Sequence, residues 1–171
     1  MIEIPLGREQ ISIVDDEDGD LLTYNWFAQF QKKYSGGGKY LAIRNTPYIN
    51  GKKSNEYLHR AILSRMAGRK LERLEFTDHI NGNTLDNRRC NLRIATPGQN
   101  QMNRGKRADN SSGFKCVFYH KQKKKWHGRF AVNGKRMTTK YFDTAEMAYR
   151  AYCEMVTPLS GEFANTGDYH E

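Results

Sequence analysis

The stretch DHINGNTLDNRRCNLRIATPGQN, residues 78–100, concentrates side chains that can hold a metal ion and move a proton. Asp78 and His79 open it, and Asn100 closes it. Carboxylate and amide oxygens suit a hard divalent cation such as Mg²⁺, which prefers oxygen ligands and keeps several waters. A neighbouring imidazole can activate water against a phosphodiester while the cation stabilises the leaving oxygen. These residue types therefore favour metal-assisted hydrolysis.

The elements around this stretch can bring its two ends together. LEFTDHI alternates like a strand, GNTLDNRRCN is a turn-rich loop, and LRIAT is a second short strand. PGQNQMNR then begins with Pro97 at a first helical turn, behind Thr96 as its cap. A strand, loop, strand and helix unit can place Asp78 and His79 beside Asn100.

A purely structural interpretation explains only part of this pattern. Asp78 could cap a turn, and the asparagines could satisfy loop backbone groups. That accounts for the loop, but not for the Asp-His pair or for Asn100. We interpret four further polar residues as loop scaffolding: Asn81, Asn83, Asp86 and Asn87. Asn103, one helical turn beyond Asn100, is a lesser ligand candidate, and His59 in the preceding segment is better explained as a packed residue than as a catalytic one.

Residues 78–100 resemble the HNH nuclease motif, the ββα-metal finger, in the variant that ends in Asn and occurs in intron-encoded and phage homing endonucleases. The flanking DHINGN, LDNR and NLRIAT also fit. The resemblance implies that Asp78 and Asn100 are metal ligands and that His79 is the general base. It implies that Asn91 braces the loop and orients His79. The CxxC pairs that bind zinc in some HNH proteins are missing from the sequence.

Before the motif, residues 1–57 predict a small α+β segment. Short strand-like runs occur at 11–15, 26–30 and 40–44, with a short helix after the acidic DEDGD. The stretch NEYLHRAILSRMAG at 55–68 predicts a helix that ends at Gly68. Its apolar positions at helical spacing are Leu58, Ile62, Leu63 and Met66.

After the motif, residues 112–166 predict a three-stranded antiparallel sheet packed on one helix. Asn133-Gly134 between two alternating runs is a strong hairpin signal. Asp143 and Glu146 have capping-box spacing at the start of a helix. Its predicted apolar stripe consists of Ala148, Ala151, Tyr152 and Met155. In the middle strand Phe130 and Val132 share one face, and His127 and Arg129 share the other.

This segment resembles the APETALA-type (ethylene-response-factor-like) DNA-binding domain, which also occurs appended to HNH endonucleases. SGFKCVFYHK, VNGKR, YFDTAEMA and GEFAN carry the resemblance, although Cys116 and Lys140 stand where the family often has Gly. In that family the sheet faces DNA, and a basic ribbon fits the major groove. The expected contacts are Lys115, His120, Lys121, Trp126, Arg129, Lys135 and Arg136. Trp126 has the same parity as Phe130, so it is equally well explained as a core residue.

Charge and composition agree with a polyanionic partner. The formal net charge is +9, and residues 104–142 contain twelve basic residues and one acidic one, Asp109. The cysteines form no CxxC pair, so we expect neither a structural zinc nor disulfides. No apolar run of about 18 residues could cross a bilayer, and MIEIPLGREQ does not resemble a signal peptide. We expect a cytoplasmic protein of a bacterial or phage-infected cell.

The sequence therefore predicts an α+β, Mg²⁺-dependent (or Mn²⁺-dependent) endonuclease that acts on double-stranded DNA as a monomer or homodimer. The expected parts are an N-terminal segment (1–57), a nuclease module (58–105), a basic linker (106–111) and a DNA-binding domain (112–171). A catalytically inactive HNH-fold regulator is the alternative. An RNA-binding protein is less well supported, because aromatic residues do not line an obvious single-strand platform. Target sequence and the choice between a nick and a double-strand break are not encoded in these patterns.

Overall fold

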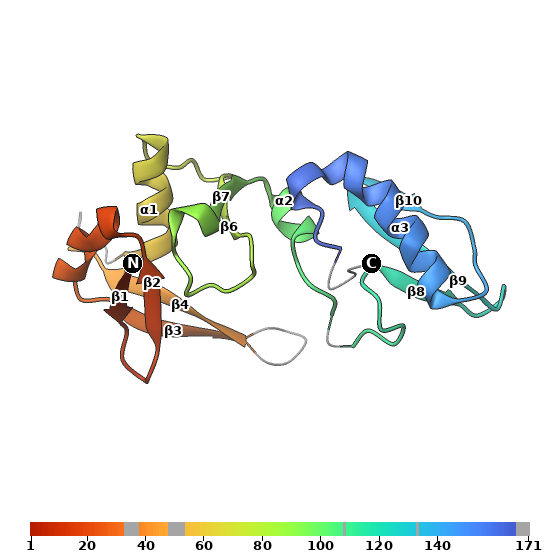
Figure 1. Cartoon of the computed structure of the whole chain (residues 1–171), viewed down its shortest axis with the longest axis horizontal. Coiled ribbons are helices and arrows are strands. Elements are labelled where there is room, and N and C mark those ends of the chain that lie inside the picture. The colour runs from red at the N-terminus through yellow and green to blue at the C-terminus, as the bar shows by residue number, and fades with distance from the viewer. Residues whose placement is uncertain (33–37, 48–53, 108, 133, 167–171) are drawn as a thin grey trace. The chain divides into compact units, whose positions relative to one another are not determined.

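The computed structural model describes residues 1–32, 38–47, 54–107, 109–132 and 134–166 (Figure 1). The chain forms two compact units, Met1–Ala95 and Thr96–Glu171. Each unit combines helix with antiparallel sheet, which confirms the predicted α+β class. The boundary falls between the second strand of the HNH-like motif and its helix. Among the described residues no helix is long and apolar enough to span a membrane.

The first unit begins with a β-hairpin and a three-stranded sheet. β1 (Ile2–Pro5) pairs with β2 (Ile11–Val14), and the short predicted helix is the 3-10 helix η1 (Asp16–Thr23). The second sheet has the order β3-β4-β5, and its strands are β3 (Phe27–Lys32), β4 (Gly38–Asn45) and β5 (Asn55–Tyr57). The three strands predicted before residue 45 are therefore present.

Helix α1 (Leu58–Ala67) packs against strands β4 and β5 and against the pair of strands at residues 76–79 and 92–95. The predicted helix over 55–68 is shorter than expected, because residues 55–57 pair with β4 as strand β5. Gly68 ends the helix in the left-handed region with φ 64, as its sequence predicts. Leu58, Ile62 and Leu63 are buried in the core, whereas Met66 at the end of the predicted stripe is 43% exposed.

Strands β6 (Phe76–His79) and β7 (Leu92–Ala95) complete the first unit, with the 3-10 turn η2 (Arg89–Asn91) between them. They are antiparallel, with Asp78 opposite Arg93. The N-terminal hairpin holds the long loop that joins them: Ile13 N donates to Leu85 O at 2.9 Å, and Asn87 N donates to Ile13 O at 2.8 Å. Residues 1–57 are therefore part of the same packed unit as the loop.

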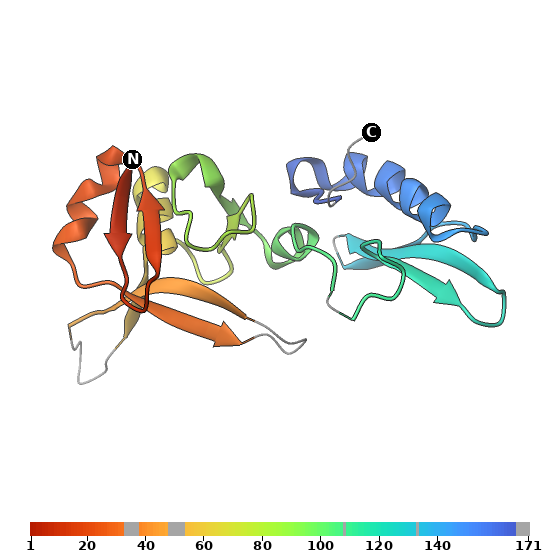
Figure 2. The same ribbon diagram turned by 60° about the horizontal axis from the view of Figure 1, so that its bottom comes forward.

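The second unit begins with α2 (Pro97–Met102) and continues with a sheet covered by one long helix. Thr96 caps α2 in a capping box with Gln99. The sheet order is β10-β9-β8, from β8 (Val117–His120), β9 (Lys125–Val132) and β10 (Lys135–Thr138). α3 (Ala145–Ser160) lies along one face of this sheet, followed by η3 (Gly161–Phe163) (Figure 2).

The predicted hairpin and helix cap of this unit have different outcomes. Lys135 pairs with Val132 and Gly134 has φ 76, as the predicted tight turn requires; Asn133 lies outside the described residues. The cap at Asp143 is wrong, because Thr144 is the N-cap and its hydroxyl accepts from Met147 N.

The apolar stripe of α3 is also rotated from its predicted position. The buried residues of this helix are Ala148, Tyr149, Tyr152 and Val156. Ala151 and Met155, which were expected in the stripe, are only half-buried. The helix therefore turns the side of Tyr149 and Val156 toward the sheet.

Candidate functional site

Asp78 and His79 occupy the end of β6, and both are buried. Adjacent residues of a strand point to opposite faces, so the two side chains have different surroundings. Asp78 lies across from Arg93 on β7, whose Nε donates to Asp78 Oδ2 at 2.8 Å. This pair fixes the orientation of the carboxylate.

The His79 imidazole contacts Asn87 in the loop. His79 Nε2 and Asn87 Oδ1 are 3.0 Å apart in a buried hydrogen bond. The resemblance to the HNH motif implies that Asn91 orients His79, and the sequence pattern places Asn87 among the loop scaffolding. In the structure Asn87 makes the hydrogen bond to His79. Its local sequence, LDNR, does not distinguish it from the other polar residues of the loop.

Asn91 lies at the base of the same loop and joins its two ends. Its side-chain oxygen accepts from Asn81 N at 2.9 Å, and its amide nitrogen donates to Asp86 O at 2.7 Å. Its backbone oxygen accepts from Ile80 N at 2.9 Å. Asn91 therefore braces the loop.

The remaining polar loop residues satisfy backbone and side-chain groups locally. Asn83 Oδ1 accepts from Leu85 N, and Asn81 Oδ1 accepts from Asn83 N. Asp86 pairs with Arg88 at 2.7 Å, which lowers the pKa of this carboxyl. These contacts are those of loop scaffolding.

A second histidine, His59 at the start of α1, lies against His79. The ring centroids are 5.4 Å apart in a T-shaped arrangement, and His59 also stacks on Tyr57. Burial lowers the pKa of His59 to about 3, with a smaller contribution from the charge of His79. Burial also lowers the pKa of His79, although the bond to Asn87 acts in the opposite direction. His59 is therefore a packed, neutral ring.

The buried His59 predicts a loss of stability in mild acid. Its pKa is about 3 when folded, against a usual 6.5, so the unfolded chain binds the proton more tightly. The stability that depends on the neutral His59 ring is fully present above pH 6.5 and is lost as the pH falls from 6.5 toward 3. At pH 5 the free energy of unfolding should be lower by about 2 kcal/mol. Urea unfolding of His59→Phe should show a weaker pH dependence over this range than the wild type. Parallel curves for the two proteins would contradict the prediction.

Asn100 and Asn103 belong to the second unit, at α2 and its C-terminal end. Asn100 N donates to Thr96 O within the helix, and Asn103 O accepts from Asn165 Nδ2 at 2.8 Å. Asp78 belongs to the first unit. Among the described residues no group of three or more His, Cys, Asp or Glu side chains could hold a metal ion.

Lys115, predicted to contact DNA, is buried instead. Its ammonium group donates to Met102 O, at the end of α2, and to Asn165 O, each at 2.5 Å. Burial lowers the pKa of this lysine. Lys115 therefore joins two chain segments within the unit, and we do not expect it to contact DNA.

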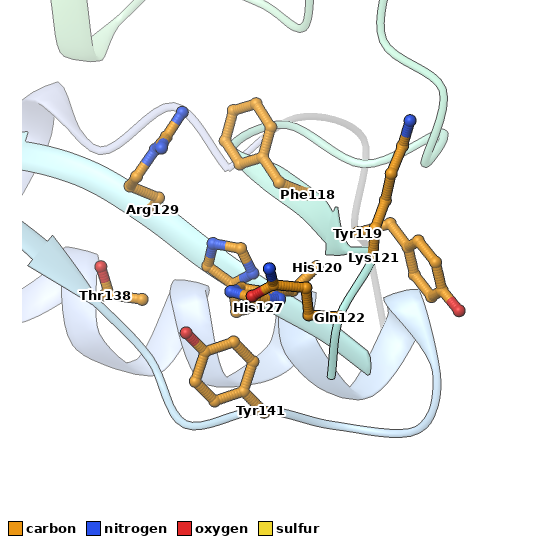
Figure 3. Close-up of a pocket in the computed structure, with 9 residues that line it drawn as sticks. All are labelled: Phe118, Tyr119, His120, Lys121, Gln122, His127, Arg129, Thr138 and Tyr141. Carbon is orange, nitrogen blue, oxygen red and sulfur yellow. The ribbon is translucent and has the colours of Figure 1, made fainter. Parts of the chain in front are cut away.

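Of the other predicted contacts, Arg129 and Arg136 lie on the sheet face opposite α3, and His120 and Lys121 line a pocket on that face. Lys135 pairs with Val132 and so shares the side of the sheet that packs on α3. Lys121, Arg129, Lys135 and Arg136 are exposed, and His120 is half-buried. A shallow pocket on this face contains Phe118, His120, His127, Arg129 and Tyr141 (Figure 3). Arg129 extends over the Phe118 ring, with its guanidinium carbon 4.8 Å from the centroid. Cationic groups and aromatic rings therefore share one open surface.

The sequence leaves Trp126 open as either a contact or a core residue and marks Cys116 as a departure from the family pattern. Trp126 is half-buried, packs against the second core cluster and lies 5.0 Å from Tyr119, ring to ring. Cys116 has φ 60, a conformation that favours glycine.

Comparison with known proteins identifies the class. The sequence model of a family described as HNH endonuclease matches residues 56–102, which include α1, β6, the loop, β7 and α2. Protein 3.8 of Escherichia phage T7 is 34% identical over 92 residues, 52% of this chain and 73% of the relative. An uncharacterized HNH endonuclease of Acanthamoeba polyphaga mimivirus is 34% identical over 107 residues, 63% of this chain.

The chain belongs to this family of HNH endonuclease proteins. It spans 54% of the length of the mimivirus relative. No solved structure matches the chain. The family match supports nuclease activity in general.

Proposed function

We propose that this protein is a metal-dependent endonuclease that hydrolyses phosphodiester bonds of double-stranded DNA. The observation that carries the proposal is the buried Asp78-His79 pair on β6, with His79 held by Asn87, inside the segment that matches the HNH endonuclease family. A histidine buried and fixed in this way is suited to proton transfer.

In this proposal His79 takes a proton from the attacking water. Asp78 and an amide oxygen of Asn100 hold the cation, the role of Asn100 being carried over from the sequence resemblance. A bound Mg²⁺ or Mn²⁺ would supply charge stabilisation for the leaving oxygen.

The C-terminal sheet is proposed to select the DNA site, as an APETALA-type domain does. The three-stranded sheet backed by one helix, its open basic face and the φ of Cys116 support this. Arg129 and Arg136 are exposed on this face, and His120 and Lys121 line its pocket; Lys135 is exposed at the start of β10. Site-specific cleavage of this kind would be consistent with the homing type that the HNH motif resembles.

The Arg93-Asp78 pair also supports a second candidate, an inactive HNH-fold DNA-binding regulator. An arginine 2.8 Å from the carboxylate competes with a metal for one oxygen. If the pair persists in the presence of Mg²⁺, the protein would bind DNA without cutting it.

Metal dependence separates the two candidates. With long duplex DNA we expect cleavage in Mg²⁺ or Mn²⁺ and none in EDTA, because the proposed ligands are oxygen atoms. Native and denaturing gels run in parallel would distinguish nicks from double-strand breaks. Circular dichroism should be unchanged by the chelator. Binding without cleavage in every metal would favour the regulator, and unfolding by EDTA would indicate a structural metal.

A further inference from the structure

A chain of buried polar groups connects the N-terminal hairpin to His79. Ser12 on β2 and Asn87 in the loop are both fully buried. Asn87 Nδ2 lies 2.8 Å from Ser12 Oγ, and Ser12 Oγ lies 2.9 Å from Leu85 O. With the bond between Asn87 Oδ1 and His79 Nε2 at 3.0 Å, three consecutive hydrogen bonds link a backbone carbonyl to the imidazole.

The direction of each hydrogen bond in this chain follows from the first. The Leu85 carbonyl can only accept, so the single Ser12 hydroxyl proton is donated to it. Ser12 Oγ must then accept from its other partner, which requires the NH₂ end of the Asn87 amide. The amide oxygen is thereby turned to His79, and Nε2 must carry the proton. In a neutral imidazole, Nδ1 is then the basic nitrogen.

We propose that Ser12 is a positioning residue that selects the Nε2-H tautomer of His79 through Asn87. The proposal deepens the proposed function, because it assumes that His79 is the general base and assigns Nδ1 as the atom that takes the proton. Ser12 itself touches neither water nor DNA in this role.

Two observations indicate that this chain of hydrogen bonds orients the Asn87 amide and does not only attach the loop to the hairpin. Ser12 lies outside residues 56–102, the segment that matches the HNH endonuclease family. The Asn87 amide that it orients lies inside that segment, 75 positions further along the chain. The backbone of its neighbour Ile13 bonds both Leu85 and Asn87. The hairpin therefore holds the loop by its backbone even without the Ser12 hydroxyl, so the hydroxyl can be removed while the loop stays attached.

The test is a direct measurement of the tautomer in the full-length, metal-free protein. Long-range ¹H–¹⁵N correlation spectra of ¹⁵N-histidine-labelled protein, recorded at alkaline pH, distinguish protonated from unprotonated ring nitrogens. We expect His79, assigned from its missing signal in His79→Gln, to be Nε2-H in the wild type. An Nδ1-H tautomer would overturn the proposal without any variant.

Ser12→Ala should then release the tautomer. Without the hydroxyl the Asn87 amide can turn over and present its NH₂ group to Nε2, so Nδ1-H signals should appear. The kcat of cleavage should fall by about 10-fold or more with KM unchanged, because a base in the wrong tautomer loses up to about 10⁴ in kcat. Ser12→Thr, which keeps the hydroxyl, should retain the wild-type tautomer.

Thr84→Val is the matched control, because Thr84 Oγ1 also donates to a backbone carbonyl, that of Tyr40, but has no bond to Asn87. It should lose comparable stability with the tautomer unchanged. A wild-type spectrum in Ser12→Ala would overturn the positioning role even if kcat fell. Absence of cleavage by the wild type in every metal would overturn the proposed function, whereas full cleavage by His79→Ala would remove only His79 from the mechanism. Either result would leave the tautomer measurement standing.

Discussion

His79→Ala and Asp78→Ala should each reduce the rate of DNA cleavage by about 10²–10⁴ while leaving DNA affinity close to that of the wild type. For His79 the reason is the loss of the group proposed to take the proton from water. For Asp78 it is the loss of the proposed carboxylate ligand. Single-turnover cleavage of end-labelled duplex in Mg²⁺, with DNA binding measured separately in EDTA, distinguishes chemistry from binding.

Both residues are buried, so stability must be controlled. His79→Ala leaves a cavity beside His59, and Asp78→Ala removes the carboxylate that pairs with Arg93. His79→Gln and Asp78→Asn keep the side-chain volume and should be almost as inactive, with smaller losses in unfolding free energy. Wild-type cleavage by either of these folded variants would remove that residue from the proposed mechanism.

Asn87→Leu provides a further comparison within the same loop. It removes the bond to His79 but keeps a side chain of similar size. Asn83→Ala removes a bond to Leu85 N that has no connection with His79. A larger loss of kcat for Asn87→Leu than for Asn83→Ala, at matched unfolding free energy, would distinguish an orienting residue from scaffolding.

Local patterns in the sequence predicted most of the elements, because turns, caps and strand alternation depend on neighbouring residues. The capping box at Thr96 and the stop at Gly68 are of this kind. The cap of α3 was misplaced by one residue, because Asp143 and Thr144 are both good caps and only the backbone geometry distinguishes them.

Long-range contacts could not be predicted in the same way. The sequence around Asn87 does not distinguish it from the other loop asparagines. Its contact with Ser12, 75 positions away, does. Lys115 fits the alternating polar pattern of an exposed strand, but its ammonium group is buried because it donates to Met102 O and Asn165 O. Both depend on chain segments that no local window contains.

The position of Lys115 also affects how the C-terminal domain can be tested. A fragment ending near Gly105 would keep Asn100 but would remove Lys115 and Asn165, which bond the last residues of α2. The packing of Met102 against the second core cluster would also be lost. Reduced cleavage by such a fragment would mix a loss of DNA binding with a loss of helix support. Point variants on the open sheet face avoid this ambiguity.

Arg129→Ala is expected to change site choice, whereas loss of Lys124 should weaken binding to all sequences equally. Arg129 is exposed in the middle of β9, over Phe118, where its guanidinium can reach a base edge from a sheet in the major groove. Losing such a contact should cost about 1–3 kcal/mol at the preferred site and relax the preference at one base position. Binding to a library of site variants measures both effects.

Lys124 lies in the turn before β9, where it can contact a phosphate but not a base edge in this proposal. Because its φ is 51, Lys124→Asn removes the charge with less backbone strain than Lys124→Ala. The slope of log affinity against log salt should become shallower by about 0.9, with the ranking of sites unchanged. The two variants should therefore differ in kind: Arg129→Ala in the ranking of sites, and Lys124→Asn in the affinity for every site. If Arg129→Ala lowers affinity for all sequences by the same factor, the sheet binds the DNA backbone without selecting the site, and selection must come from the first unit.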